Sequence, residues 1–368
     1  MFNGMLNVYK EAGWTSNDVV SKLRGILHMK KIGHTGTLDP DAEGVLPVCL
    51  GSGTKLVDFI ADRDKEYIAV LKLGVSTDTQ DLSQGSAVLS SMPEEEVLQR
   101  VNADALEAAA ASFLGDYAQV PPMYSALSVN GRRLYEYARA GQTVERKERH
   151  VTIHAIEILG TRLPRVTLRV RCSKGTYIRT LCDDIGRKLG TGGAMESLLR
   201  TRVGLFSLGD ALKLEEIRKL ADEGEIASRI IPVSDFFADC PAAHVKQESA
   251  RGLYNGNAMR ESEFREPVTA VLEAISAAAA SAAAADPEAA QSSAVGKFDG
   301  SASVPAGLVS GRVRVYDAED RFCAIYRYDS EKALFRPEQM FLPEELVPNN
   351  KKIPEQKAEQ QDCRPDPE

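Results

Sequence analysis

The segment Gly33-His34-Thr35-Gly36-Thr37-Leu38-Asp39-Pro40-Asp41-Ala42-Glu43-Gly44 lies directly before the apolar run Val45–Leu50. Its glycines and its Asp-Pro pair predict a loop. Acidic residues in such loops are usually solvated, which is one interpretation of Asp39. The other is that Asp39, ionised at neutral pH, is a nucleophile in a loop whose glycines let another backbone approach closely. These residues alone leave both interpretations open.

Around this loop the sequence predicts a mixture of strands and helices. Residues that favour β-structure predict strands at 6–9, 67–73, 151–159 and 166–172. Apolar residues at helical spacing and good helix starts predict helices at 15–27, 54–61, 93–114 and 180–189. Pro121–Ser125 is expected to be extended. Strand-like segments at 313–316 and 322–328 suit a small β domain.

Composition limits the classes of protein to which the chain can belong. The 368 residues are 43% hydrophobic and 27% charged, which is typical of a globular protein of about two domains. No run approaches the roughly 20 apolar residues of a membrane span, and we find no secretory signal. Six cysteines are scattered without a C-x-x-C pair, and no histidine stands at zinc-ligand spacing. We therefore expect a cytoplasmic protein without a membrane contact or a metal site.

The charge of the chain is distributed unevenly. A net charge of −8 alone argues against a nucleic-acid partner. Residues 131–202, however, hold 16 Lys and Arg against 7 Asp and Glu, and the segments on both sides are acidic. Clustered basic charge is typical of a surface that contacts a phosphate backbone. A solvated basic face is the alternative explanation, and charge alone does not choose between the two.

Two further segments carry residues suited to binding a base and an anion. Asp62–Tyr67 leads into a predicted strand, where Tyr67 alone would be an ordinary packing residue. Lys174–Leu181 lies at a predicted strand-to-helix junction, and if the strand continues past Tyr177, then Tyr177 and Arg179 share one face. An aromatic ring beside a guanidinium suits a flat polar base next to an anion. A pairing of Arg179 with a local carboxylate explains the second segment equally well.

Six stretches resemble the motifs of the TruB-type tRNA pseudouridine synthases. They are 33–40, 65–67, 121–127, 131–136, 174–181 and 198–204. The resemblance covers most of residues 4–250 and, more loosely, 308–346. One such motif would be weak, whereas six in the order of the family are specific. Glu11 departs from the pattern, because the family usually has proline there.

The resemblance implies roles for particular residues. Asp39 falls on the catalytic aspartate of the family, and Arg179 on the arginine that pairs with it. Tyr67 falls on the aromatic residue that stacks on the target base and is counted with the catalytic group. The other matches imply substrate-binding positions: His34 near the extruded nucleotide, Tyr177 and Leu198 in the pocket lining, and Lys10 and Lys55 near the site.

The resemblance also implies the fold. It is α/β (α+β), with the pseudouridine synthase catalytic fold built on a central mixed, largely antiparallel sheet, plus a small C-terminal PUA-like β domain. The catalytic domain is expected at 1–250, with an RNA-gripping insertion at 121–150. The β domain is expected at 251–348, interrupted by the Ala/Ser-rich insertion 270–306. Residues 349–368 are expected to form a disordered tail.

The implied activity is the isomerisation of uridine to pseudouridine at position 55 in the T-loop of tRNA. The reaction breaks the N-glycosidic bond, turns the uracil and rejoins it through carbon, so the nucleotide must be flipped out. This isomerisation needs no cofactor and no metal. The sequence does not decide whether Asp39 attacks the ribose or the base ring. The expected partner is the T arm of tRNA, bound by a monomer without a protein partner.

Four alternatives are weighed against this function. Gly51–Lys55 superficially resembles a phosphate loop but lacks the required spacing. A hydrolase that uses Asp39 with Asp41 or Glu43 would release free uracil, and it leaves the basic stretch unexplained. A non-catalytic RNA-binding or RNA-folding module would need the basic surface but not Asp39. A related synthase could act on ribosomal or guide-directed RNA, but the long 121–150 segment favours tRNA.

Overall fold

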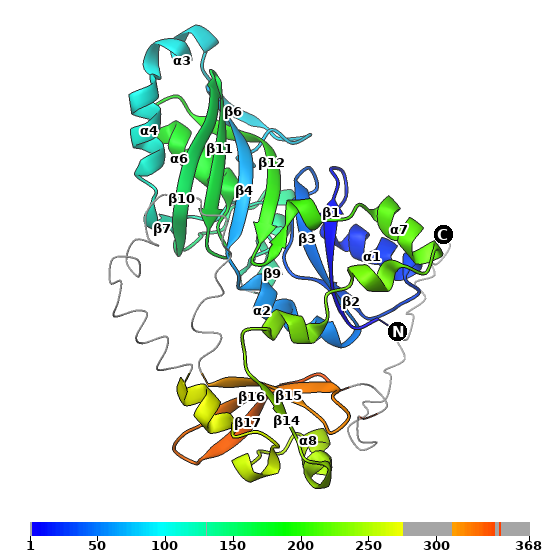
Figure 1. The fold of residues 1–368 in the computed structure, drawn as a ribbon. Coiled ribbons are helices and arrows are strands. Elements are labelled where there is room, and N and C mark those ends of the chain that lie inside the picture. The colour runs from blue at the N-terminus through cyan, green and yellow to red at the C-terminus, as the bar shows by residue number, and fades with distance from the viewer. Residues whose placement is uncertain (1, 130, 275–310, 343–345, 347–368) are drawn as a thin grey trace, which may run out of the picture. The chain divides into compact units, whose positions relative to one another are not determined.

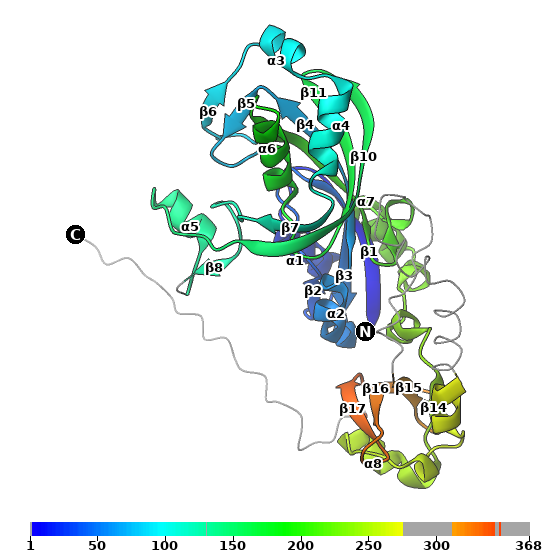
Figure 2. The same ribbon diagram turned by 90° about the vertical axis from the view of Figure 1, so that its left-hand side faces the viewer.

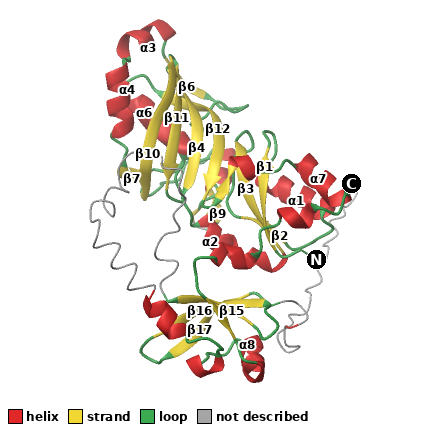
Figure 3. Cartoon of the chain, viewed as in Figure 1, coloured by secondary structure: helices red, strands yellow, loops and turns green. Residues whose placement is uncertain are grey.

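The structure is a computed structural model that describes residues 2–129, 131–274, 311–342 and 346. These residues form two compact units, one up to Phe236 and the other from Phe237 onward (Figure 3). Among the described residues, no helix combines the length and the apolar character that a membrane span requires.

A nine-stranded sheet is the frame of the first unit (Figure 1). Its strands are β1 (Gly4–Lys10), β2 (Ile32–His34), β3 (Glu43–Leu50), β4 (Lys65–Leu73), β7 (Gly115–Gln119), β10 (Arg149–Arg162), β11 (Arg165–Cys172), β12 (Gly193–Val203) and β13 (Phe206–Ser207). Seven follow the order β1-β3-β12-β4-β11-β10-β7, while β2 pairs with β3 and β13 with β12. Strands β3 and β12 pair in parallel, and the other pairs in this sheet are antiparallel. The prediction of a mixed, largely antiparallel sheet is confirmed.

Two hydrophobic cores hold helices against this sheet. Every second residue of β4 from Tyr67 to Leu73 is buried, and this face packs with α3 (Glu94–Arg100), α4 (Ala103–Ala111) and α6 (Ile178–Lys188). Helices α1 (Ser16–Ile26) and α7 (Leu214–Asp222) share the second core with β1 and β3. Figure 2 shows α4 and α6 beside β4 and β10. A small hairpin, β5 (Val75–Thr77) with β6 (Val88–Ser91), stands apart from the large sheet.

Local sequence signals explain where the helices begin. Thr15 caps α1, near the predicted start of this helix at residue 15, because its hydroxyl accepts from the Asp18 N–H and the Asp18 carboxylate accepts from the Thr15 N–H. The helix predicted at 93–114 is two helices, because Val101 is extended and Asn102 starts a new helix by accepting from the Ala105 N–H. The helix predicted at 54–61 begins as a 3₁₀ turn, Gly51–Leu56, before α2 (Val57–Ala61).

The predicted insertion 121–150 contains a hairpin and a short helix. Pro121–Ser125 forms neither a helix nor a strand, and it is followed by β8 (Ser128–Val129), β9 (Arg132–Arg133) and α5 (Leu134–Arg139). Backbone hydrogen bonds from Leu134 to Leu127 (2.8 Å) and from Tyr135 to Ser125 (3.1 Å) tie the helix to the segment before the hairpin. Figure 2 shows α5 and β8 extending away from the large sheet.

The second unit is a four-stranded sheet with its own core. Its strands are β14 (Ala242–His244), β15 (Arg312–Tyr316), β16 (Phe322–Asp329) and β17 (Leu334–Met340), and α8 (Ala250–Asn255) packs with them. The core residues Val313, Val315, Ala324 and Tyr326 are fully or almost fully buried. The strands predicted at 313–316 and 322–328 are therefore confirmed.

The boundary between the units differs from the predicted one. The second unit begins at Phe237 rather than at residue 251, because β14 pairs with β15 and the Phe237 ring packs 6.2 Å from the Phe341 ring. Leu272 is also buried in this core, so the chain just after residue 270 is part of the unit rather than of a separate insertion. The remainder of the predicted insertion, 275–306, and the predicted tail 349–368 lie outside the described residues.

Candidate active site

Asp39 and Arg179 meet in the first unit across 140 residues of sequence. Asp39 lies in the loop between β2 and β3, and Arg179 lies in the first turn of α6. Arg179 Nε lies 3.1 Å from Asp39 Oδ2, and Nη2 lies 3.3 Å from Oδ1. The Arg179 side chain is 7% exposed and the Asp39 side chain 40% exposed. A buried guanidinium thus holds the carboxylate on one side and leaves part of it open to a ligand.

Arg179 also contacts a second carboxylate and two backbone carbonyls. Its Nη1 lies 3.3 Å from Asp81 Oδ2 and donates to the Thr79 carbonyl at 3.2 Å. Its Nη2 donates to the Tyr124 carbonyl at 2.9 Å. Every nitrogen of the guanidinium therefore has an acceptor, so that its orientation toward Asp39 is fixed from three sides.

The loop that carries Asp81 is itself held by side chains. Asp81 Oδ1 accepts from the Thr79 hydroxyl at 2.7 Å. Gln80, between them, has a φ of 63°, a left-handed conformation that costs energy for a residue other than glycine. The Gln80 side chain offsets that cost by accepting from the Thr180 hydroxyl at 2.7 Å and donating to Asp183 at 3.2 Å. The loop is thereby fastened to the helix that carries Arg179.

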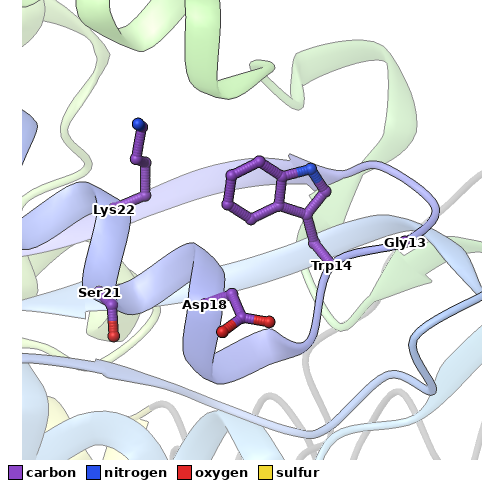
Figure 4. Close-up of a pocket in the computed structure, with 5 residues that line it drawn as sticks. All are labelled: Gly13, Trp14, Asp18, Ser21 and Lys22. Atoms are coloured by element: carbon purple, nitrogen blue, oxygen red, sulfur yellow. The ribbon is translucent and has the colours of Figure 1, made fainter.

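Lys10 fastens the other side of the Asp39 loop. Its side chain is fully buried, and Nζ donates to the carbonyls of Glu11 (3.1 Å), Trp14 (2.6 Å) and Pro40 (2.8 Å). The Gly13 N–H also donates to the Pro40 carbonyl at 3.0 Å. Figure 4 shows the hollow beside this turn, which Gly13, Trp14, Asp18, Ser21 and Lys22 line. The residue that follows Asp39 is therefore anchored to the end of β1.

The predicted pocket residues come from four different elements. Tyr67 lies on β4 and Leu198 on β12, and both are at least nine-tenths buried in the core that also contains Leu38. Tyr177 directly precedes α6 and is held by Gln119, which accepts from its backbone N–H at 2.8 Å and donates to its carbonyl at 3.0 Å. His34 ends β2 and is partly buried. Because α6 begins at Ile178, Tyr177 and Arg179 do not lie on one strand, and the condition under which they were expected to share a strand face is not met.

Burial controls the charges of these groups. Burial raises the pKa of the Asp39 carboxyl, the Arg179 guanidinium opposes that rise, and the negative charge of Asp81 adds to it. Burial raises the pKa of Tyr67 to about 12, so its hydroxyl is neutral at neutral pH. Burial and the positive charge of Arg200 both lower the pKa of His34, which favours the neutral imidazole. In this site the Asp39 carboxyl thus lies beside the permanently charged Arg179 guanidinium and among the neutral rings of Tyr67 and His34.

Comparisons with known proteins place this arrangement in a family. Residues 24–178 match the family model described as TruB family pseudouridylate synthase (N terminal domain), and residues 179–237 match the tRNA pseudouridylate synthase B C-terminal domain. A protein of Lachnoclostridium phytofermentans named tRNA pseudouridine synthase B is 44% identical over 348 residues, which cover 92% of this chain and 100% of that protein. The chain belongs to the TruB family of pseudouridylate synthases. A relative of the same name in Clostridium novyi is 47% identical over 254 residues, which cover 69% of this chain and 84% of that protein.

Solved structures agree with the TruB-family fold. An archaeal box H/ACA sRNP Nop10–Cbf5 complex contains a chain with a TM-score of 0.59 and 22% identity, over 94% of this chain and 88% of that one. A chain in an H/ACA RNP bound to a substrate RNA containing 2′-deoxyuridine has a TM-score of 0.57. At this level of identity the likeness concerns the fold alone.

In this TruB-family chain the two predicted lysines have different surroundings. We predicted that Lys10 binds substrate, but its three N–H groups are all used by backbone carbonyls, so its task in the structure is to hold the Asp39 loop. Lys55 lies in the 3₁₀ turn after β3, where burial and the neighbouring charge of Lys31 lower its pKa. A contact between Lys55 and substrate stays a prediction.

Two residues that contact the candidate site of this TruB-family chain were not predicted from the sequence. Asp81 shares Arg179 with Asp39, and Arg200 lies against Tyr67 and the Asp39 loop. A sequence signal existed for Arg200, because it is a charge inside a strand whose neighbours Leu198 and Leu199 are apolar. The acidic loop residue Asp81 had no such signal, since its contact with Arg179 spans 98 residues.

We predict that Asp81→Asn slows conversion without weakening RNA binding. Asparagine keeps the shape but loses the charge that holds Arg179 Nη1, an interaction of about 1.5–3 kcal/mol. The single-turnover rate constant should therefore fall roughly 10- to 100-fold, while the Kd for tRNA stays within about twofold. Rapid-quench assays with enzyme in excess measure the first quantity, and filter binding measures the second.

Asp104→Asn, at an exposed position of α4, is the matched control and should leave both quantities unchanged. A full rate for Asp81→Asn would contradict a role for the shared guanidinium in orienting Asp39.

Proposed function

We propose that this TruB-family chain isomerises uridine 55 in the T-loop of tRNA to pseudouridine, with Asp39 as the nucleophile. The observation that carries the proposal is the pairing of a part-exposed Asp39 carboxylate with the buried, fully bonded Arg179. The relatives named tRNA pseudouridine synthase B support the substrate. An ionised carboxylate next to a fixed cation is ready to attack without prior loss of a proton.

The residues around Asp39 fit the steps of the reaction. The bond between the ribose carbon and N1 of uracil breaks, a new bond forms to C5, the C5 proton leaves and N1 gains a proton. Attack at the ribose or at the ring needs the same carboxylate. The flipped uracil would lie against the apolar Leu198 and the rings of Tyr67 and Tyr177, where stacking contributes about 1–3 kcal/mol per base. His34, neutral at neutral pH, would occupy space beside the nucleotide.

The rest of the chain supplies surfaces for the tRNA. We propose that the first unit is the catalytic domain and that the second unit extends the RNA surface. The insertion 121–150 would grip the T arm, because its exposed arginines and its hairpin with α5 extend from the sheet. We place the reaction in the cytoplasm of the cell and treat the enzyme as a monomer. The five described cysteines, all buried free thiols, fit a reducing compartment.

A hydrolase that uses two carboxylates fits the geometry less well. Asp41 is exposed, and Glu43 accepts from the Tyr9 hydroxyl at 3.2 Å. The carboxylate that shares Arg179 with Asp39 is Asp81, which is buried and bonded on both oxygens, so it is not free to activate water. A non-catalytic RNA-binding module would not need the Asp39–Arg179 pair.

The test is the nucleotide-resolved mapping of pseudouridine in unmodified tRNA transcripts incubated with the protein. We expect conversion at position 55 and no free uracil in the supernatant. A transcript with cytidine at position 55 is the matched control and should gain no pseudouridine. Release of uracil would favour the hydrolase, and binding without any conversion would favour the RNA-binding module.

The rate of conversion should also depend on the ionisation of Asp39. Only the carboxylate attacks, so the single-turnover rate constant should fall as the pH is lowered through the pKa of Asp39. Since burial raises that pKa, the fall should begin at a higher pH than an exposed aspartate would give. In Asp81→Asn protein, a charge that raises the pKa of Asp39 is absent, and the fall should move to lower pH. Identical pH profiles in the two proteins would show that Asp39 is not the titrating group.

A further inference from the structure

Arg200 is the bulkiest of the fully buried side chains in the described part of the chain, with 2% of its surface exposed. It forms no ion pair with a described carboxylate, and the acidic partner that usually accompanies a buried arginine is missing around it. Burying a cation without a counter-charge is costly, and an apolar residue of the same volume would pack there at lower cost. The retention of this charge therefore calls for an explanation beyond packing.

The contacts of Arg200 join both ends of the Asp39 loop. Its Nε donates to the Val45 carbonyl at 2.7 Å, and its Nη2 donates to the Gly36 carbonyl at 3.3 Å. Gly36 lies shortly before Asp39 and Val45 shortly after it, so one planar group spans the segment that contains the carboxylate. The rigid fork of a guanidinium suits this task, because its donors point in fixed directions.

The same side chain also contacts Tyr67. Arg200 on β12 stands directly opposite Tyr67 on β4 in the sheet register, and its positive charge lowers the pKa of the Tyr67 hydroxyl against the larger effect of burial. Strand β12 pairs on its other side with β3, where Arg200 faces Gly44. A side chain larger than hydrogen at Gly44 would collide with the Arg200 carbonyl, at 2.2 Å from the position of its Cβ. The backbone of Arg200 is thus packed as closely as its side chain.

We propose that Arg200 is a positioning residue that sets the Asp39 loop and the Tyr67 ring in one mutual arrangement, so that carboxylate and stacking ring face the same flipped base. This inference rests on the proposed function of Asp39 and Tyr67. Arg200 itself is buried, so it would act through the loop and the ring and not by touching the substrate. Its contribution lies in the geometry of the bound nucleotide and not in the affinity for tRNA.

The charge of Arg200 acts on the titratable groups around it. Its positive charge lowers the pKa values of Lys10, His34 and Lys65. It also lowers the pKa of Tyr67, although burial has the larger effect there and raises that pKa. Of these, His34 titrates closest to neutral pH and can be followed by NMR. The chain contains five histidines, so that single substitutions of the other four allow assignment of its ring signals.

The experiment compares Arg200→Met with Arg200→Lys. Methionine fills similar space without charge, and we expect a folded protein with an unchanged or raised Tm, a Kd for tRNA within about twofold of the wild type, and a single-turnover rate about 100-fold lower. The pKa of His34 should rise. Lysine keeps the charge but lacks the fork, so it should restore the low pKa of His34 and only part of the rate. Arg218→Met, an exposed arginine on α7, is the control and should change none of these quantities.

A double-mutant cycle with Tyr67→Phe separates positioning from general destabilisation. If Arg200 acts partly through the Tyr67 hydroxyl, the loss of rate in the double variant should be smaller than the product of the two single losses. If the loss of rate in the double variant equals the product of the two single losses, Arg200 does not act through the Tyr67 hydroxyl, and Tyr67 is removed from the proposal.

Three outcomes would overturn the inference. The first is a wild-type single-turnover rate in Arg200→Met. The second is a fall in tRNA affinity that accounts for the whole loss of rate, and the third is a loss of rate that is explained by a lowered Tm. If Arg200→Met does not fold, Arg200→Lys decides, since a folded lysine variant with the full rate overturns the role of the guanidinium fork. Failure of the proposed function is seen separately, because the wild type would then form no pseudouridine in the same assay.

Discussion

Asp39→Asn protein should bind tRNA with the affinity of the wild type and lose at least about 10⁴-fold in the rate of pseudouridine formation, because the amide is not a nucleophile. Asparagine keeps the size of the side chain and an oxygen that can accept from Arg179. The loss should therefore come from chemistry and not from folding. The measurement is single-turnover conversion of tRNA transcripts, with the Kd for tRNA and the Tm determined on the same protein.

Asp41→Asn is the matched control, because Asp41 lies in the same loop, two residues away, and is exposed. It should convert tRNA at the wild-type rate. If both variants convert tRNA normally, Asp39 is not the nucleophile, and the proposed chemistry of its carboxylate is wrong.

Arg179→Lys should lower the single-turnover rate by roughly 10²- to 10³-fold, the effect of losing about 3–4 kcal/mol of stabilisation of the reacting carboxylate. Lysine retains the charge but not the fork that places Nε and Nη2 on Asp39 while Nη1 holds Asp81 and Thr79. Without that fork the carboxylate can rotate away from the base. The Kd for tRNA should change little, since the side chain is buried behind Asp39.

The control for this substitution is Arg100→Lys, which alters an exposed ion pair with Glu96 on α3. Exposed pairs contribute little, so its rate and its Tm should match the wild type. A normal rate in Arg179→Lys would show that a point charge suffices near Asp39 and that the bidentate geometry is incidental.

The pairing of Asp39 with Arg179 could be predicted from sequence because both residues lie in motifs of the family. The contact of Arg179 with Asp81 could not, since no local pattern connects a loop acid with a helix residue 98 positions later. Lys10 illustrates a different limit. The resemblance implied that Lys10 binds substrate, whereas three backbone carbonyls take all its donors in the folded protein. The sequence identified the residue but not its task.

The same limit applies to the fold. Features that depend on neighbouring residues could be predicted, and features that depend on contacts between distant residues could not. The start of α1 was predictable because Thr15 and Asp18 cap it within one turn. The boundary at Phe237 was not, because it depends on the pairing of β14 with β15, on the far side of the Ala/Ser-rich segment. The character of the sequence changes around residues 232–250, a range that contains Phe237 but does not select it. Strand pairing placed the boundary at Phe237.

The position of β12 in the large sheet has a consequence for how the chain is made. Strand β12 is synthesised after β1, β3, β4, β7, β10 and β11, yet it lies between β3 and β4. Until Gly193–Val203 has left the ribosome, β4 presents an open hydrogen-bonding edge to the cell, and β3 does so at Glu43 and Gly44, since β2 pairs with its other end. The nascent protein therefore passes through a stage in which the strands on the two sides of β12 are already synthesised but are not yet joined by it. In that stage, pairing of an open strand edge with another chain competes with its correct pairing to β12. Conditions that slow translation just before residue 193 should lower the yield of folded enzyme more than the same delay after residue 203.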